Sequence, residues 1–393
     1  MESFVSKNKW SLLLAGAVVQ IFTGVPAAWG VFQKPVKQAF GVEDWFASMI
    51  FAFTVGSFGV GCILGGLLQD KKGPRVAGIV GAVMLSGGFA LSGLVPESMP
   101  WLLFFTFSLL VGLGCAFLYP SVMSAAQKWY SDKKGVATGV IGGAVGLSGA
   151  VLTLLGRWFI KMWGIHGAFL GFGAVMAVCC GSACILLCNP PKVAQQPKKK
   201  QQGKDYTVKQ MLKTKQYYLV FFVVALATPA VLLFSPIIVE LGEQRGLSES
   251  AAHLSIIIGS FGSAAGRLAM PALSDKIGRR AVDLGLFAAL CLLSVAFIFA
   301  QGWWVIAGYT VLTFCYSGEA AVIPALGTDL FGFKNAGVNY GFLALGMSLG
   351  SVVFSLIAGG FGAVLARNII AIAATALGFV LLLFLKPTQG KKL

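Results

Sequence analysis

Twelve long apolar segments constrain the fold of this chain more than any other feature. Each is about 20 residues or longer, the length at which a helix crosses the roughly 30 Å hydrocarbon core of a bilayer. They lie near 10–32, 46–69, 76–95, 100–123, 135–157, 165–188, 216–240, 250–273, 281–300, 303–327, 337–359 and 367–386. The chain is 57% hydrophobic and 11% charged, which excludes an ordinary soluble domain. The sequence therefore predicts an all-α polytopic membrane protein with twelve transmembrane helices.

The basic residues predict how the chain is oriented. The net charge is +16, and the chain has 30 lysines and arginines. If the N-terminus is cytoplasmic, 23 of these 30 fall on the cytoplasmic side and six on the other, with Arg267 inside the membrane. This positive-inside bias predicts a plasma (inner) membrane protein with both termini cytoplasmic. It accounts for the excess of basic residues without a nucleic-acid partner. We expect membrane lipid to surround the protein.

An internal repeat predicts two related halves. Asp70-Lys71-Lys72-Gly73 recurs as Asp275-Lys276-Ile277-Gly278, Pro120 recurs as Pro324, and Gly135-Val136-Ala137-Thr138-Gly139 recurs as Gly337-Val338-Asn339-Tyr340-Gly341. The three matches keep nearly one offset and the same order, which is typical of parallel six-helix repeats. We therefore expect bundles at 1–188 and 216–393, joined by a cytoplasmic linker at 189–215. Small residues at Gly135, Gly139 and Gly143, and at Gly142 and Gly146, predict close helix packing.

Arg267 is the most unusual residue for its predicted location. It lies eight residues before Asp275, roughly 12 Å inside the hydrocarbon at 1.5 Å per residue. An arginine at such depth costs about 2.5–3.5 kcal/mol on insertion scales, so it should face a polar cavity or a partner. A substrate-binding role is the first interpretation. The alternative is a structural arginine paired with a carboxylate or with helix-end carbonyls.

Glu319 is the second costly residue, roughly 22 Å along the tenth predicted helix from Trp304. One hypothesis is that Glu319 forms an ion pair with Arg267 when no substrate is bound. When substrate binds Arg267, Glu319 would take up a proton, which would couple uptake to H⁺. The other is a structural glutamate with no role in transport.

Several motifs resemble one family of transporters. The Gly-x-x-x-Asp-x-x-Gly turn after the second helix, repeated after the eighth, resembles the major facilitator superfamily. Three stretches resemble its oxalate/formate antiporter family and the related monocarboxylate porters: Trp129-Tyr130-Ser131-Asp132-Lys133-Lys134-Gly135, Lys209-Gln210-Met211-Leu212-Lys213-Thr214-Lys215-Gln216-Tyr217, and Asn339-Tyr340-Gly341-Phe342. The resemblance implies that Arg267 binds the substrate carboxylate.

Departures from the oxalate antiporter pattern imply a different substrate. Met347 stands where that antiporter has a lysine, so one membrane cation remains and a monocarboxylate fits better than a dianion. Aromatic residues that cage oxalate are replaced by Ala27, Ala320 and Ala344, which implies a wider cavity.

Other residues complete the predicted site. Tyr119 and Tyr340 are candidate donors to the anion, with plain interhelical hydrogen bonding as the alternative. Trp29 would cover an apolar side of the cavity or pack against a neighbour. The two repeated turns are expected to latch the halves on the cytoplasmic face through Asp70, Gly73, Arg75, Asp275, Gly278 and Arg279.

The sequence favours a transporter over an enzyme. It contains no nucleotide loop, metal-ligand cluster or nucleophile–base pair, so no cofactor, metal or catalytic residue is expected. The leading prediction is an alternating-access secondary transporter of small monocarboxylates such as lactate, pyruvate or formate, proton-coupled or anion-exchanging, and functional as a monomer. The alternatives are an exporter or facilitator of another solute in which Arg267 is structural, and a metabolite sensor that does not transport.

Overall fold

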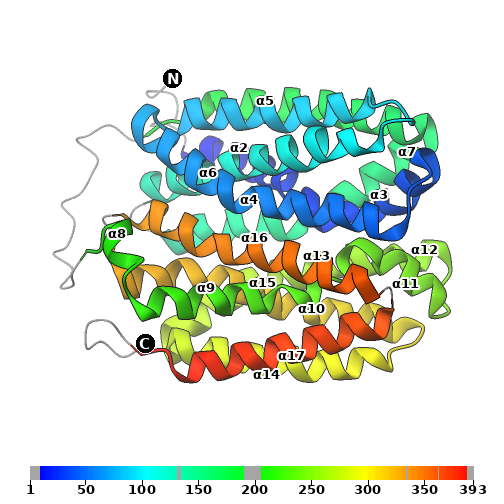
Figure 1. The fold of residues 1–393 in the computed structure, drawn as a ribbon. Helices are drawn as coiled ribbons and strands as arrows, with labels where there is room; N and C mark the ends of the chain where they lie inside the picture. Colours follow the sequence, from blue (N-terminus) through cyan, green and yellow to red (C-terminus); the bar gives the residue numbers. More distant parts are fainter. Residues whose placement is uncertain (1–8, 131–133, 190–204, 333–334, 362, 387–393) are drawn as a thin grey trace.

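The computed structural model describes residues 9–130, 134–189, 205–332, 335–361 and 363–386. Helices make up most of these ranges, and no strand occurs within them. Most of the predicted linker, at 190–204, and the centre of one motif, at 131–133, lie outside the described residues. The helices run side by side along one long axis (Figure 1).

The chain forms two sets of helices in sequence order. The first comprises α2 (Lys9–Thr23), α3 (Val25–Phe40), α4 (Asp44–Lys72), α5 (Pro74–Gly93), η1 (Pro100–Leu102), η2 (Phe104–Val111), α6 (Gly112–Trp129) and α7 (Lys134–Leu186). The second comprises α8 (Val208–Met211), α9 (Lys215–Ala227), α10 (Pro229–Leu232), η5 (Ser235–Ile237), α11 (Ile238–Gln244), α12 (Glu249–Ala252), α13 (Leu254–Ile277), α14 (Arg279–Ile298), α15 (Trp303–Phe331), α16 (Ala336–Phe361) and α17 (Val364–Leu383).

Twelve membrane spans are confirmed. In the described residues, 11 helical segments are long and apolar enough to cross a bilayer. One of them, Ala137–Leu186, has 50 residues, more than twice the length that one crossing needs. Its backbone leaves the helical region at Gly164, where φ is 65° and ψ is −173°. The segment therefore folds back at Gly164 and supplies two spans.

Each half of the chain builds its own hydrophobic core. One buried cluster draws on residues between Leu12 and Cys188, and a second draws on residues between Met211 and Leu385. Figure 1 shows the two resulting bundles, one blue to green and one green to red. The end of the predicted linker belongs to the second bundle, because Met211 is fully buried there and the Tyr206 amide donates to the Phe331 carbonyl at 2.9 Å.

The bundles meet through small residues on two helix pairs, α4 with α16 and α7 with α13. A Cβ atom added to Gly146 of α7 would lie 2.4 Å from the Ala264 Cα of α13. On the other pair, the Gly59 amide donates to the Ser348 hydroxyl at 3.0 Å. Glycine thus permits the close approach that the spacing at Gly142 and Gly146 predicted.

The repeated turns have the same backbone geometry in both halves. Gly73 and Gly278 adopt φ values of 88° and 99°, and each precedes the first residue of a helix. A residue with a Cβ would be strained at these angles, which explains the glycine in both copies of the motif.

The first and seventh spans are each interrupted near their middle. The first breaks at Gly24, between α2 and α3, ahead of Pro26. The seventh breaks around Pro229 and again at Ser235 and Pro236, between α9 and α11. Both breaks lie where the bundles face each other, because Gly24 and Ser235 line the cavity described below.

Candidate functional site

A cavity of about 170 Å³ lies between the two bundles. Residues of both halves line it, and Arg267 is the charged side chain among them. The full lining is Thr23, Gly24, Pro26, Ala27, Val55, Phe58, Tyr119, Val145, Gly146, Ser148, Val231, Leu232, Ser235, Ile256, Gly259, Ser260, Ser263, Arg267, Tyr309, Thr313, Tyr316, Ser317, Ala320, Tyr340 and Met347. The cavity therefore combines one fixed positive charge with hydroxyl groups and apolar walls.

Arg267 has no hydrogen bond or ion pair with another described residue. Its Nε atom is buried without a partner. Two other arginines differ: the buried Arg367 donates to the Leu233 carbonyl at 2.7 Å, and the half-buried Arg245 donates to the Phe297 carbonyl at 2.7 Å. Because a buried donor without an acceptor is costly, the half-buried Arg267 is suited to bind an anion that enters the cavity.

Four tyrosines from three helices line the same cavity as Arg267. They are Tyr119 on α6, Tyr309 and Tyr316 on α15, and Tyr340 on α16. The sequence pointed to Tyr119 and Tyr340, and the structure brings both together with Arg267. It did not point to Tyr309 or Tyr316, although tyrosines within the predicted span 303–327 were a usable signal.

Trp29 lies in the core of the first bundle. Its ring packs 4.9 Å from that of Phe107, its Nε1 donates to the Gln33 side chain at 2.6 Å, and only 1% of the residue is exposed. This location fits the packing interpretation of Trp29, and the cavity lining does not include it.

Two of the three alanines predicted to widen the cavity do line it. These are Ala27 and Ala320, and Met347 lines it as well. Ala344 is instead buried against Gly59 of α4. A Cβ atom added to Gly59 would lie 3.2 Å from the Ala344 carbonyl oxygen.

Glu319 is buried on α15 beside the cavity but outside its lining. Only 1% of the residue is exposed, and its Oε1 atom has no partner. Ion pairs among the described residues involve Lys34, Lys37, His166 and Arg279, and none joins Glu319 to Arg267. The pair that the first coupling hypothesis requires is thus absent from this arrangement.

Asp283 on α14 is a buried acid that the sequence analysis did not single out. It is fully buried, and neither carboxylate oxygen has a partner. An acidic residue inside the predicted span 281–300 was the available signal.

Comparison with known proteins identifies the fold. The model of the Major Facilitator Superfamily matches residues 12–242 and 220–393. The chain belongs to the major facilitator superfamily. It is similar to the oxalate:formate antiporter of Oxalobacter formigenes, at 28% identity over 98% of this chain and 93% of the antiporter. It is also similar to an uncharacterized MFS-type transporter of Escherichia coli (strain K12), at 24% identity over 88% of this chain and 86% of that one.

A mammalian relative matches part of the chain. Monocarboxylate transporter 9 of Mus musculus is 28% identical over 44% of this chain and 34% of its own length. As a member of the superfamily, the chain is a multi-pass integral membrane transporter related to the oxalate:formate antiporter and to monocarboxylate transporters.

The superfamily's repeated turn residues make contacts within each bundle. Arg75 donates to the Leu187 carbonyl at 3.2 Å, and Arg280, 205 residues further on, donates to the Leu382 carbonyl at 2.9 Å. The counterpart of Arg75 is therefore Arg280, which the sequence analysis did not name. Equivalent arginines thus bind the C-terminal carbonyls of equivalent helices, α7 and α17.

Arg279 links three parts of the second bundle. It forms ion pairs with Asp275 on α13 and with Asp329 on α15, and it donates to the Pro271 carbonyl. The contacts described for Arg75 and Arg279 do not cross between the bundles. The side chain of Asp70 lies outside the described part of the structure.

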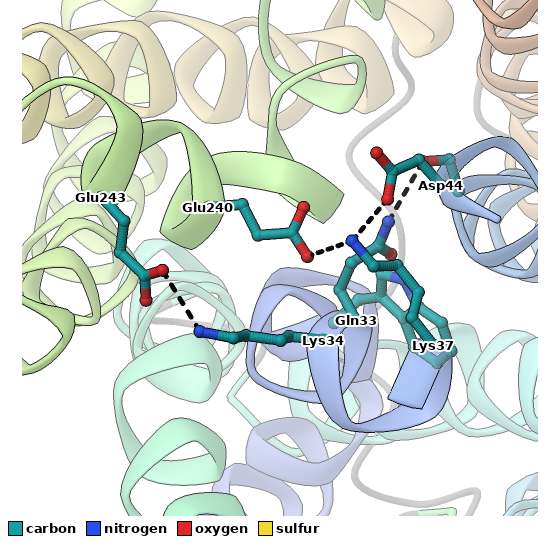
Figure 2. Close-up of polar contacts among 8 residues, drawn as sticks. Gln33, Lys34, Lys37, Asp44, Glu240 and Glu243 are labelled. Atoms are coloured by element: carbon teal, nitrogen blue, oxygen red, sulfur yellow. Dashed lines mark hydrogen bonds and ion pairs between the residues drawn. The ribbon is translucent and has the colours of Figure 1, made fainter. Parts of the chain in front are cut away.

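Charged residues join the bundles at the end of this transporter opposite to α8. Lys34 pairs with Glu243 at 3.2 Å, and Lys37 pairs with Glu240 at 2.7 Å and with Asp44. Figure 2 shows these five residues, which we call the α3–α11 ion-pair cluster. Hydropathy does not predict this contact, because Lys34 and Lys37 follow the apolar segment 10–32. Here α3 continues to Phe40 and carries both lysines to α11.

Proposed function

We propose that this major facilitator is an alternating-access secondary transporter of small monocarboxylate anions, with Arg267 as the group that binds the carboxylate. The observation that carries the proposal is a half-buried arginine, with a buried Nε atom and no described partner, in a cavity between two bundles. Its planar fork can bind both oxygens of one carboxylate, and in a low dielectric this charge pair is strong. Tyr119 and Tyr340 are proposed as further donors to the anion.

The single positive charge in the described lining of the cavity supports a substrate with one negative charge. Arg267 is the charged residue in the lining, and Met347 occupies the place of the lysine expected in the oxalate antiporter. A dianion would leave one negative charge without compensation, and an unpaired buried charge is costly. The oxalate:formate antiporter is named for one dianion and one monoanion, and this cavity suits the second kind of substrate.

The size of the cavity supports a substrate larger than formate. An apolar cavity of about 150 Å³ in another protein accommodates benzene, which has six carbon atoms. The cavity here has about 170 Å³. Lactate and pyruvate also have six non-hydrogen atoms, so either fits with its carboxylate at Arg267 and its methyl group against Ala27 or Ala320.

The rival readings of Arg267 receive less support. A structural arginine would be expected to bond to backbone carbonyls, as Arg245 and Arg367 do. Three driving forces are compatible with this proposal: the gradient of the substrate itself, cotransport of a proton, and exchange for another anion. We also propose that the transporter lies in the plasma (inner) membrane with both termini cytoplasmic, works as a monomer, and uses its two Asp-x-x-Gly turns as a cytoplasmic latch.

Uptake into proteoliposomes tests the function. Labelled lactate, formate and oxalate would be offered to wild type, to Arg267→Ala, and to Lys161→Ala, which removes one positive charge from an exposed position on α7. We expect lactate uptake by wild type and Lys161→Ala, and none by Arg267→Ala. No arginine-dependent uptake of any carboxylate would overturn the proposal.

The same assay separates the modes of transport. Uptake that rises with an imposed inward proton gradient identifies a proton-coupled porter. Uptake that does not change with the proton gradient but rises when anion is present inside the vesicles identifies an exchanger. Binding of carboxylate to the purified protein without any flux would identify a sensor.

A further inference from the structure

Two serine hydroxyls in the cavity differ from the others. The Ser263 and Ser317 Oγ atoms lie 2.7 Å apart, one on α13 and one on α15, and both residues line the cavity. Four other serine and threonine hydroxyls of the lining bond to a carbonyl in their own chain segment. These are Thr23 to Gln20, Ser148 to Val145, Ser260 to Ile256 and Thr313 to Thr310. Ser263 and Ser317 bond to each other and not to a backbone carbonyl, so a ligand can engage them without displacing a bond between a hydroxyl and the backbone.

The hydroxyl pair results from an unusually close helix crossing. A Cβ added to Gly262 would lie 2.5 Å from the Thr310 carbonyl oxygen, and one added to Gly266 would lie 2.2 Å from that of Phe314. The backbones of α13 and α15 therefore touch on both sides of Ser263. Only at such a distance can two short serine side chains meet.

The pair lies beside the proposed carboxylate site. Ser263 precedes Arg267 by four residues on α13, about 6 Å along the axis. Because helical side chains lean toward the N-terminus and cover the preceding turn, we expect the Arg267 side chain to lie on the side of Ser263. A carboxylate bound to Arg267 thus places its α-carbon near the two hydroxyls.

The chemistry of the pair matches an oxygen substituent. Each serine offers one O–H donor and two acceptor lone pairs. Their mutual bond uses one donor, so the second O–H is free to donate and lone pairs are free to accept. A hydroxyl group can therefore form two bonds here, and a keto oxygen can accept one.

We propose that Ser263 and Ser317 bind the α-oxygen of the substrate, so that the transporter selects 2-hydroxy and 2-oxo monocarboxylates over unsubstituted ones of the same size. This inference rests on the proposed function of Arg267 and adds a specificity determinant to it. Propanoate would fill nearly the same space but has no α-oxygen to bond to the serine hydroxyls. A site built to bind a hydroxyl group binds a ligand that lacks it more weakly.

The test compares two ligands that differ in one oxygen. Purified full-length protein in detergent is titrated with L-lactate and with propanoate by calorimetry, for wild type, Arg267→Ala, Ser263→Ala, Ser317→Ala and the variant that carries both serine substitutions. We expect wild type to bind lactate about tenfold more tightly than propanoate, a difference of about 1.4 kcal/mol. The double variant should bring the ratio of the two dissociation constants close to one.

The design guards against a folding defect. The double variant removes both partners of one hydrogen bond, so no buried hydroxyl is left without a partner. A general loss of folded protein would lower the apparent binding of both ligands and leave their ratio unchanged. Ser86→Ala is a matched control, because its hydroxyl bonds to the Ala82 carbonyl on α5, outside the cavity lining. It should keep the wild-type ratio.

The outcomes separate this inference from the proposed function. Equal affinity of wild type for lactate and propanoate, with both lost in Arg267→Ala, overturns the role of the serines and keeps that of the arginine. A ratio that survives in the double variant overturns the serine role as well. Failure of wild type to bind either ligand overturns both proposals.

Discussion

Lys37 on α3 forms an ion pair with Glu240 on α11, with 2.7 Å between the ammonium nitrogen and the carboxylate oxygen. The two residues are 203 positions apart and belong to different bundles. Their side chains are 21% and 16% exposed, so water screens this pair less than it screens a surface pair. Together with Lys34 and Glu243, they connect the bundles at one end of the cavity.

The Lys34–Glu243 pair allows a charge-swap test of this connection. Glu243→Lys places two positive charges side by side, and their repulsion should separate α3 from α11. We expect a membrane-impermeant maleimide to react faster with Ser235→Cys, a cavity position on η5, in this background. None of the eight native cysteines lines the cavity, so the background reaction should be small.

Restoring the opposite charges provides the control for that experiment. Lys34→Glu combined with Glu243→Lys recreates the pair in reverse, and the reaction rate should return toward that of Ser235→Cys alone. A rate that does not respond to either change would contradict a role of this pair in holding the bundles together.

Arg267→Lys separates charge from geometry in the cavity. Lysine keeps the positive charge but loses the planar fork that binds two oxygens at once. We expect the dissociation constant for lactate to rise about tenfold, in line with the loss of one charge-assisted hydrogen bond of about 1.5 kcal/mol or more. Calorimetric titration measures it, and wild-type affinity would show that the fork is not used.

Gly266→Ala should destabilise the contact between α13 and α15. The added methyl group would lie 2.2 Å from the Phe314 carbonyl oxygen, which is backbone and cannot rotate away. Overpacking of this kind costs about 1–3 kcal/mol. We expect a lower unfolding temperature in detergent and weaker binding of lactate.

Gly285→Ala is the matched control on α14. A Cβ added there meets no atom within 4 Å, so the substitution should leave the unfolding temperature unchanged or raise it. Equal effects of the two glycine substitutions would refute the importance of the close crossing.

Glu319→Gln tests the coupling hypothesis. Because Glu319 neither lines the cavity nor pairs with Arg267, we expect uptake and its response to a proton gradient to stay within about twofold of wild type, the usual range for a neutral change. Proteoliposome uptake with and without an inward proton gradient measures both. Loss of the gradient response alone would identify Glu319 as the proton carrier.

The sequence by itself determined the architecture and the central charge of the site. Segments of about 20 apolar residues must span the membrane as helices, because backbone groups in lipid have no water to bond. The repeat of Gly73 at Gly278 follows from a local requirement for positive φ. Arg267 stood out because an arginine inside such a segment is costly wherever its helix packs. All of these are local properties of the chain.

Only the tertiary structure decided which side chains meet at the cavity. Hydropathy does not say which face of a helix is turned inward, and Trp29 faces the core of its bundle while Tyr316 faces the cavity. The Ser263–Ser317 and Lys37–Glu240 contacts join residues 54 and 203 positions apart. Such contacts depend on how closely whole helices approach, and that distance is fixed by packing of glycines and side chains from both halves of the chain.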